Sequence, residues 1–222
     1  MKKTKILWLS IFCLSIIFTL ILSGCEEEPK DNEDTTTKIY IENSKNDGYI
    51  AREESLVEGI IVLESSEPMK VGLFSSSEDS PNEQNYISRG ILRFDISDWD
   101  NTDITFYIKC TNVIGNPNPL EVYFIDDPGV LVDFSSIWPL TDSSIKFFGD
   151  AFPSDNEWIE ISVPQGFVDT IVKEKYSRNE YMTIMLKLYI DDTLNEYGNY
   201  YEFATVDYSP NDDSDQPYIK FG

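Results

Sequence analysis

The sequence contains no histidine, and only three of its 222 residues are cysteines. Histidine is the general base of Ser-His-Asp and Cys-His nucleophile systems and the commonest metal ligand, so these kinds of active site are excluded. Cys13, Cys25 and Cys110 are too few for a disulfide framework or a thiolate zinc cluster. These absences exclude most of the common catalytic sites.

Basic residues are also scarce. The chain has 17 Lys+Arg against 40 Asp+Glu, which gives a formal net charge of −23. Lys2, Lys3 and Lys5 belong to an N-terminal leader, and without them the balance is 14 to 40, a charge of −26. A surface of this charge repels nucleic acid and anionic headgroups, and it keeps copies of the chain apart. We therefore expect a monomer that does not bind nucleic acid.

The first 25 residues have the pattern of a secretory signal: a cationic start, 17 uncharged residues from 6 to 22, and then small residues. Leu22-Ser23-Gly24-Cys25 resembles a bacterial lipobox. The resemblance implies that residues 1–24 are a lipoprotein signal peptide and that Cys25 carries the lipid. An uncleaved N-terminal membrane anchor is the alternative. Both interpretations place the rest of the chain outside the cytoplasm, tethered to the cell membrane or the outer membrane.

Residues 25–37 follow as an acidic segment with one proline and no aromatic residue. Such a segment buries too little apolar surface to fold, so we expect a disordered spacer after the lipidated cysteine. The remaining residues, 38–222, are enough for one hydrophobic core and are predicted to form a single domain.

Apolar and polar residues alternate along most of this domain, as in Ile104, Phe106, Ile108 and Cys110. Period-two alternation predicts half-buried strands. The predicted strands cover residues 90–96, 104–110, 120–126, 157–163, 182–190, 200–206 and 217–221. Residues 165–175 have apolar residues spaced as on one face of a short helix. We expect an all-β fold, a two-sheet antiparallel sandwich of jelly-roll type with eight to ten strands, one short helix and Cys110 in the core.

Four segments occur in an order that resembles a known family. They are residues 47–50 (DGYI), 88–97 (SRGILRFDIS), 158–163 (WIEISV) and 216–221 (QPYIKF). This order is similar to the DNRLRE-type domain, which is related to carbohydrate-binding module family 96 and to the C-terminal domain of archaeal disaggregatases. The string that names the family is absent, and residues 203–209 stand in its place. The resemblance implies a noncatalytic β-sandwich that accompanies polysaccharide-acting proteins, with alginate and related glycans as ligands.

Arg93 lies on the polar phase of a strand whose other phase is Leu92, Phe94 and Ile96. It is a candidate ligand-binding residue, with Asp95 beside it on the same phase. The alternative is structural, because charges inside a strand commonly pair with a neighbouring strand or a returning loop.

Acidic residues gather in two loops, and such loops supply the oxygen ligands that calcium prefers. The candidate calcium ligands are Asp47, Asp212, Asp213 and Asp215. Neither loop has the twelve-residue calcium-binding pattern. If the domain binds a structural calcium ion, we expect these four carboxylates to be its ligands.

Aromatic residues are the positive feature that indicates a ligand, since 30 of the 222 residues are Phe, Trp or Tyr. Tyr107, Tyr123, Trp158 and Tyr189 fall on outward phases, with Trp99 and Trp138 in loops. Sugars pack their C–H faces on such rings, and acidic neighbours favour a neutral or amine-bearing glycan over a polyuronate. The alternative is that tyrosine simply has a high β propensity and pairs well across strands.

No pair of carboxylates stands out as a glycosidase site, so we expect no catalysis. The sequence predicts a membrane-anchored lipoprotein that binds polysaccharide at the cell surface or in the periplasm. The alternative is a structural or adhesion module that contacts an envelope protein.

Overall fold

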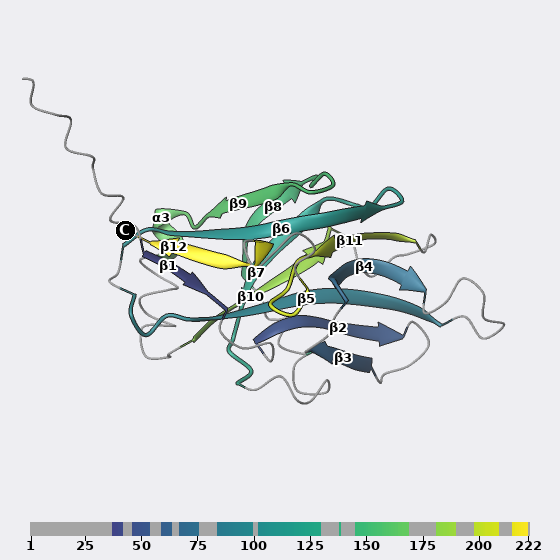
Figure 1. Ribbon diagram of the computed structural model, residues 1–222, viewed down its shortest axis with the longest axis horizontal. Helices are drawn as coiled ribbons and strands as arrows, with labels where there is room; N and C mark the ends of the chain where they lie inside the picture. The colour runs from purple at the N-terminus through teal and green to yellow at the C-terminus, as the bar shows by residue number, and fades with distance from the viewer. Residues whose placement is uncertain are drawn as a thin grey trace, which may run out of the picture. The chain divides into compact units, whose positions relative to one another are not determined.

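The computed structural model describes residues 37–41, 46–53, 59–63, 67–75, 84–99, 102–129, 138, 145–168, 181–189, 198–208 and 215–221. These residues form antiparallel β structure with one short helix (Figure 1), which confirms the mostly-β prediction. Residues 36–222 make one compact unit. The predicted signal peptide, Cys25, nearly all of the spacer, Asp212 and Asp213 lie outside the described residues.

The described part of the chain contains twelve strands and one helix, α3 (Gln165–Phe167). The strands are β1 (Thr37–Tyr40), β2 (Asp47–Glu53), β3 (Gly59–Leu63), β4 (Met69–Ser75), β5 (Asn85–Asp95), β6 (Ile104–Ile114), β7 (Leu120–Ile125), β8 (Ile145–Ala151), β9 (Trp158–Ser162), β10 (Tyr181–Leu188), β11 (Asn199–Phe203) and β12 (Tyr218–Phe221). All seven predicted strands are present. The expected number of eight to ten was too low, because β2, β3, β4 and β8 have little regular alternation and β1 has only four residues.

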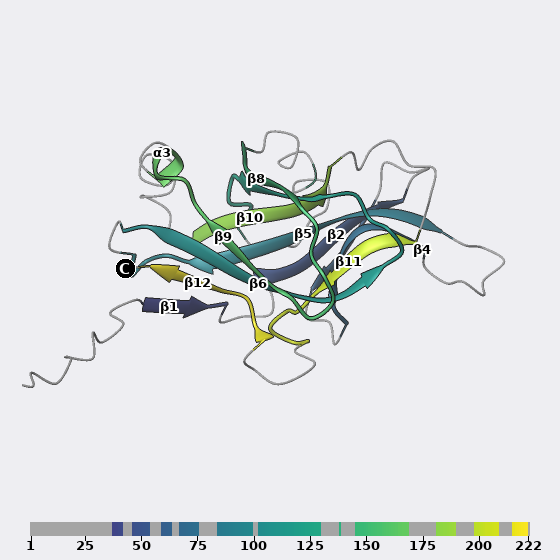
Figure 2. The ribbon, with the colours of Figure 1, turned by 90° about the horizontal axis from the view of Figure 1, so that it is seen from above.

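The strands pair in the order β1-β12-β6-β11-β4-β5-β10-β7-β8, with β2 on β5, β3 on β2 and β9 on β6. Every ladder that the described residues form is antiparallel. The long strand β6 (Figures 1 and 2) changes partners along its length: residues 104–109 pair with β12 and β9, and later residues pair with β11. One strand therefore connects two groups of pairings.

The main core lies on the apolar side of β6. Ile104, Phe106, Ile108 and Cys110 are fully buried, and the residues between them are partly exposed, as the alternation predicts. The ring of Phe106 lies 5.6 Å from that of Phe94 on β5 and 6.2 Å from that of Phe124 on β7. Since β6 does not pair with β5 or β7, these contacts join the faces of strands rather than their edges. Cys110 is fully buried, which confirms its predicted place in the core, and this burial raises the pKa of its thiol to about 12.

A second apolar cluster corrects the prediction for β7 and β10. Their alternation predicts one polar face for each strand, yet Glu121, Thr183 and Met185 are buried. The cluster comprises Ile50, Leu73, Ile87, Ile91, Ile125, Trp138 and Met185. Trp138, predicted to lie in a loop within reach of a sugar, is 8% exposed, with the guanidinium of Arg89 4.3 Å from its ring centre. The central strands are therefore covered on both faces.

Candidate functional site

Strand register gathers four aromatic residues on one face of β1, β12, β6 and β9. Tyr40 lies opposite Tyr218, which lies opposite Tyr107, and Trp158 lies one diagonal step away on β9. Directly opposed residues of antiparallel strands point to the same side of a sheet. We call Tyr40, Tyr218, Tyr107 and Trp158 the aromatic row.

Tyr218 is the centre of the aromatic row. Its ring stacks on Tyr107 at 4.6 Å between centres and 7° between planes. Tyr40 lies 5.3 Å from it at 43°, and Trp158 lies 5.6 Å from it at 63°. Burial, with the neighbouring Tyr107 and Tyr40, raises the pKa of Tyr218 above its usual value. The stacking of Tyr107 on Tyr218 covers one face of each ring, whereas Tyr40 at one end of the row is 40% exposed.

Lysines flank the aromatic row. The ammonium of Lys38 is 5.0 Å from the ring centre of Tyr218, and that of Lys109 is 5.6 Å from that of Trp158. Lys220 on β12 is directly opposite Lys38 on β1 in the strand register, so its side chain lies on the same face of the sheet. The acidic residue that the register places on this face is Glu160, opposite Tyr107. The described charged neighbours of the aromatic row are thus mainly basic, whereas we expected acidic neighbours from the sequence.

The structure brings together two of the four predicted aromatic residues. Tyr107 and Trp158 are in the aromatic row, but Tyr123 and Tyr189 are elsewhere. Tyr123 donates a hydrogen bond to Oε2 of Glu121 at 2.6 Å, and the ammonium of Lys187 is 4.8 Å from its ring centre. Tyr189 is 48% exposed beyond the end of β10, where its N–H donates to the carbonyl of Pro119.

Sequence reasoning missed Tyr40 and Tyr218. Tyr218 stands in a predicted strand, but its partners depend on a pairing with β1 that no local pattern reveals. Strand β1 has only four residues, which is too short for a convincing alternation. The signal that was present is the sequence Lys38-Ile39-Tyr40, in which polar and apolar residues do alternate.

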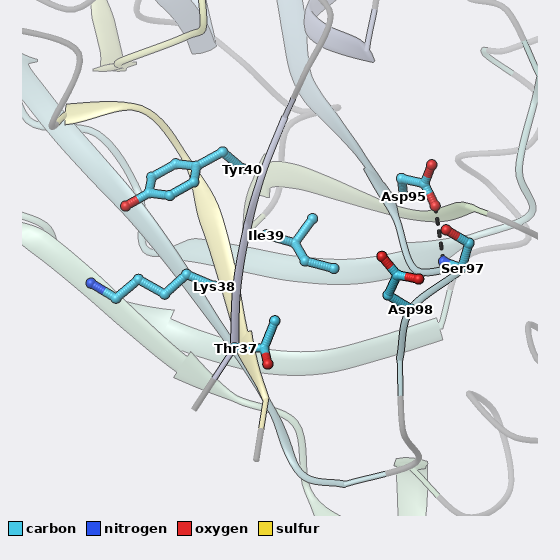
Figure 3. A pocket seen from close by; sticks show the side chains of 7 residues that line it. All are labelled: Thr37, Lys38, Ile39, Tyr40, Asp95, Ser97 and Asp98. Atoms are coloured by element: carbon cyan, nitrogen blue, oxygen red, sulfur yellow. Dashed lines mark hydrogen bonds between the residues drawn. The ribbon is translucent and has the colours of Figure 1, made fainter. Parts of the chain in front are cut away.

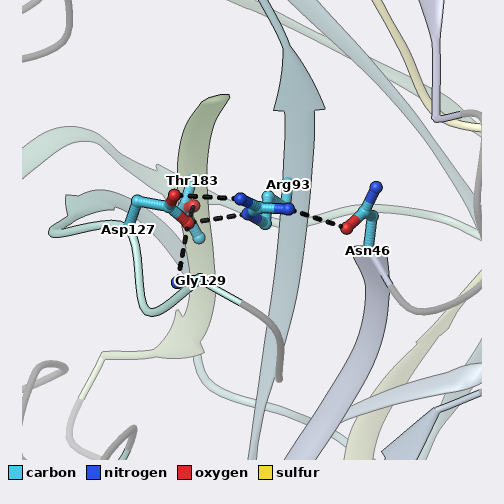
Figure 4. A network of polar contacts seen from close by, with 5 residues as sticks. All are labelled: Asn46, Arg93, Asp127, Gly129 and Thr183. Atoms are coloured by element: carbon cyan, nitrogen blue, oxygen red, sulfur yellow. Dashed lines mark hydrogen bonds and ion pairs between the residues drawn. The ribbon is translucent and has the colours of Figure 1, made fainter. Parts of the chain in front are cut away.

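Arg93 is held by a polar network inside the chain (Figure 4). Its Nε donates to Oδ1 of Asp127 at 2.7 Å, and its Nη2 donates to Oδ2 at 3.0 Å. Nη1 donates to Oδ1 of Asn46 at 3.1 Å, and the guanidinium lies 3.5 Å from the ring centre of Tyr181. Its ionic partner is thus in the segment after β7, as the structural interpretation predicts.

Asp127 joins further segments to this network. It accepts hydrogen bonds from the hydroxyl of Thr183 on β10 at 3.1 Å and from the N–H of Gly129 at 3.2 Å. The network therefore ties the residue before β2, the end of β5, the start of β10 and the segment after β7. The guanidinium of Arg93 is thus held by Asp127, Asn46 and the ring of Tyr181, an arrangement that favours the structural interpretation of this residue.

The candidate calcium ligands are only partly described. Asp47 is buried, and its Oδ2 accepts a hydrogen bond from the N–H of Val206 at 2.7 Å. Burial, opposed by that hydrogen bond and reinforced by Asp207, raises the pKa of Asp47 to about 7. Asp215 is also buried. Among the described residues, no group of three or more acidic or cysteine side chains is placed to hold a metal ion, so calcium binding stays a prediction.

An open cleft of about 430 Å³ lies between β1 and the turn that follows β5 (Figure 3). It is lined by Thr37, Lys38, Ile39, Tyr40, Asp95, Ser97 and Asp98. Ile39 points toward the turn, whereas the side chains of Lys38 and Tyr40 point away from it, toward the aromatic row. Oδ1 of Asp95 accepts a hydrogen bond from the N–H of Ser97 at 2.9 Å. One face of β1 therefore contributes to the cleft, and the opposite face contributes to the aromatic row.

The described residues define an antiparallel β protein with an aromatic, lysine-flanked sheet face. No protein-family model matches the chain, and no curated protein matches it. Within the described residues, no helix has the length and apolar character needed to span a membrane.

Proposed function

We propose that this chain is a lipid-anchored extracytoplasmic lipoprotein whose β domain binds polysaccharide without catalysing a reaction. The aromatic row carries this proposal. It spans four neighbouring strands, and Tyr40 at one end is 40% exposed. A sugar chain laid across the strands packs its C–H faces against Tyr40 and Trp158, and its hydroxyl groups bond to the flanking polar side chains.

The flanking charges favour an acidic glycan. Lys38, Lys109 and Lys220 share the face with the aromatic row, so a carboxylate or sulfate on the ligand finds a cation near the rings of Tyr218 and Trp158. Exposed ion pairs contribute only about 0.2–1 kcal/mol each and weaken with salt. Binding at this face should therefore depend on both ring contact and ionic strength.

We also propose the finer fold that the sequence suggests, a two-sheet sandwich of jelly-roll type like that of the DNRLRE-type domain. Two observations support it. The ring of Phe106 on β6 contacts the rings of Phe94 on β5 and Phe124 on β7, although β6 pairs with neither strand. In addition, β6 changes partners midway along its length. Membrane attachment through Cys25 rests on the lipobox-like residues 22–25.

Affinity gel electrophoresis tests the proposed function. The chain without its first 25 residues is run through gels that contain neutral or acidic polysaccharides, each with and without calcium. We expect retardation by an acidic polysaccharide that is lost in the variant Tyr40→Ala/Trp158→Ala. Tyr189→Ala is the matched control, because Tyr189 is exposed but lies outside the row. Retardation only with calcium would transfer the site to the acidic loops.

The second candidate is a structural or adhesion module that contacts an envelope protein. The stacking of Tyr107 on Tyr218 favours it, since cross-strand tyrosine pairs stabilise sheets without any ligand. A folded protein that no polysaccharide retards would support this second candidate.

A further inference from the structure

Strand β1 has one unpaired edge. It pairs with β12 on one side, and among the described residues no strand pairs with its other side. An edge strand turns alternate N–H and C=O groups outward, where they can accept another strand. The cleft of about 430 Å³ lies along β1, and Asp95, Ser97 and Asp98 line it on the side opposite this strand.

The cleft has the chemistry for a peptide with a positive charge. Asp95 and Asp98 form its far wall, and Asp98 is exposed. Ile39 supplies an apolar contact at the centre, next to the main core. The ring of Tyr40 points away from the cleft (Figure 3), so the described lining offers no ring on which a sugar could stack.

Charge also decides between possible occupants. The segment that precedes β1 reads Glu-Glu-Glu-Pro-Lys-Asp-Asn-Glu-Asp over residues 26–34, and its acidic residues would be repelled by Asp95 and Asp98. A second copy of the chain, also with a net charge of −23, would be repelled as well. A basic partner is attracted both to the whole molecule and to the wall of the cleft.

We propose that the cleft beside β1 is a docking site for an extended basic segment of a partner protein. The segment adds as a strand to the unpaired edge of β1 and places a lysine or arginine against Asp95 and Asp98. This inference goes beyond the polysaccharide site, because that site uses the side chains of β1 that point the opposite way.

Fluorescence anisotropy with the full-length chain in detergent tests the inference. The probe is a labelled hexapeptide of alternating lysine and valine. An alternating glutamate and valine peptide is the charge control. Two further lysine peptides are N-methylated, one at the odd-numbered amides and the other at the even-numbered amides. Each of them lacks the N–H groups along one edge and cannot pair with β1 along that edge. We expect the lysine peptide to bind, the glutamate peptide not to bind, and at least one methylated peptide to lose binding.

Asp98→Asn should weaken binding of the lysine peptide about three-fold at low salt, the size of one exposed ion pair. Asp103→Asn should leave it unchanged, because Asp103 is exposed in the same β5–β6 connection but does not line the cleft. The inference is overturned if the lysine peptide fails to bind, or if both methylated peptides bind as tightly as the unmethylated lysine peptide. It is also overturned if Asp103→Asn weakens binding as much as Asp98→Asn does. None of these outcomes touches the polysaccharide site, whose test variants are Tyr40→Ala and Trp158→Ala.

Discussion

Asp47 begins β2 with its side chain buried and one oxygen held by the N–H of Val206. Burial raises the pKa of this carboxyl from its ordinary value of 3.8 to about 7 in the folded protein. A raised carboxyl pKa stabilises the fold fully below about pH 4, and this contribution is lost as the pH rises to about 7. Deprotonation of Asp47 therefore makes the native state less stable at neutral pH.

Asp47→Asn should remove this pH dependence. Asparagine keeps an acceptor for Val206 and has no charge, so the variant should be more stable than the wild type above pH 7, on the order of 4 kcal/mol at most. Urea unfolding at several values between pH 4 and 8 measures the difference. Asp98→Asn, an exposed carboxylate, is the control and should follow the wild type. Equal pH profiles for wild type and Asp47→Asn would contradict this account of Asp47.

The strands are tied at one point by Asp127, which accepts hydrogen bonds from Arg93, Thr183 and Gly129. Asp127→Asn removes the charge opposite the largely buried guanidinium, so it should lower the free energy of unfolding by about 2 kcal/mol. Glu67→Gln removes an exposed carboxylate that pairs with Lys70 and should cost less than about 1 kcal/mol. Chemical denaturation measures both. An equal cost would show that the network of Arg93 has no special structural role.

Strand β4 depends on a glycine where it meets β11. Gly72 has a φ of +128°, and a Cβ there would lie 2.7 Å from the carbonyl oxygen of Asn199. Gly72→Ala should therefore cost about 3 kcal/mol, from backbone strain and the clash together. Gly166→Ala places its methyl group in open space and should change stability by less than about 1 kcal/mol. Thermal unfolding of both variants checks the contrast, and a tolerated alanine at residue 72 would refute it.

The alternation of apolar and polar residues in the sequence predicted those strands that have one buried face and one solvent-exposed face. The alternation of β6 and β9 is visible in the sequence and is present in the structure. The burial of both faces of β7 and β10 was not visible, because it depends on a cluster whose other members, such as Ile50, Leu73 and Ile91, come from strands far away in the sequence. The aromatic row was half visible: Tyr107 and Trp158 follow from alternation, but their neighbours Tyr40 and Tyr218 follow from nonlocal register.

The whole molecule, as we propose it, combines a membrane tether with a strongly acidic domain that carries one basic, aromatic face. If Cys25 holds the lipid, Cys25→Ser should abolish labelling of the protein by a radioactive fatty acid. Cys13→Ser, in the uncharged part of the leader, is the control and should leave labelling intact. Labelling that survives Cys25→Ser would contradict the anchor.

The central claim is that polysaccharide binds at the aromatic row, and tryptophan fluorescence tests it most directly. Trp158 belongs to the row, whereas Trp99 donates a hydrogen bond to the carbonyl of Thr102 in the β5–β6 connection. Titration with the polysaccharide that retards the protein should change the emission of the wild type and of Trp99→Phe, and the change should be lost in Trp158→Phe. An undiminished change in Trp158→Phe, or no change in the wild type, would contradict the claim.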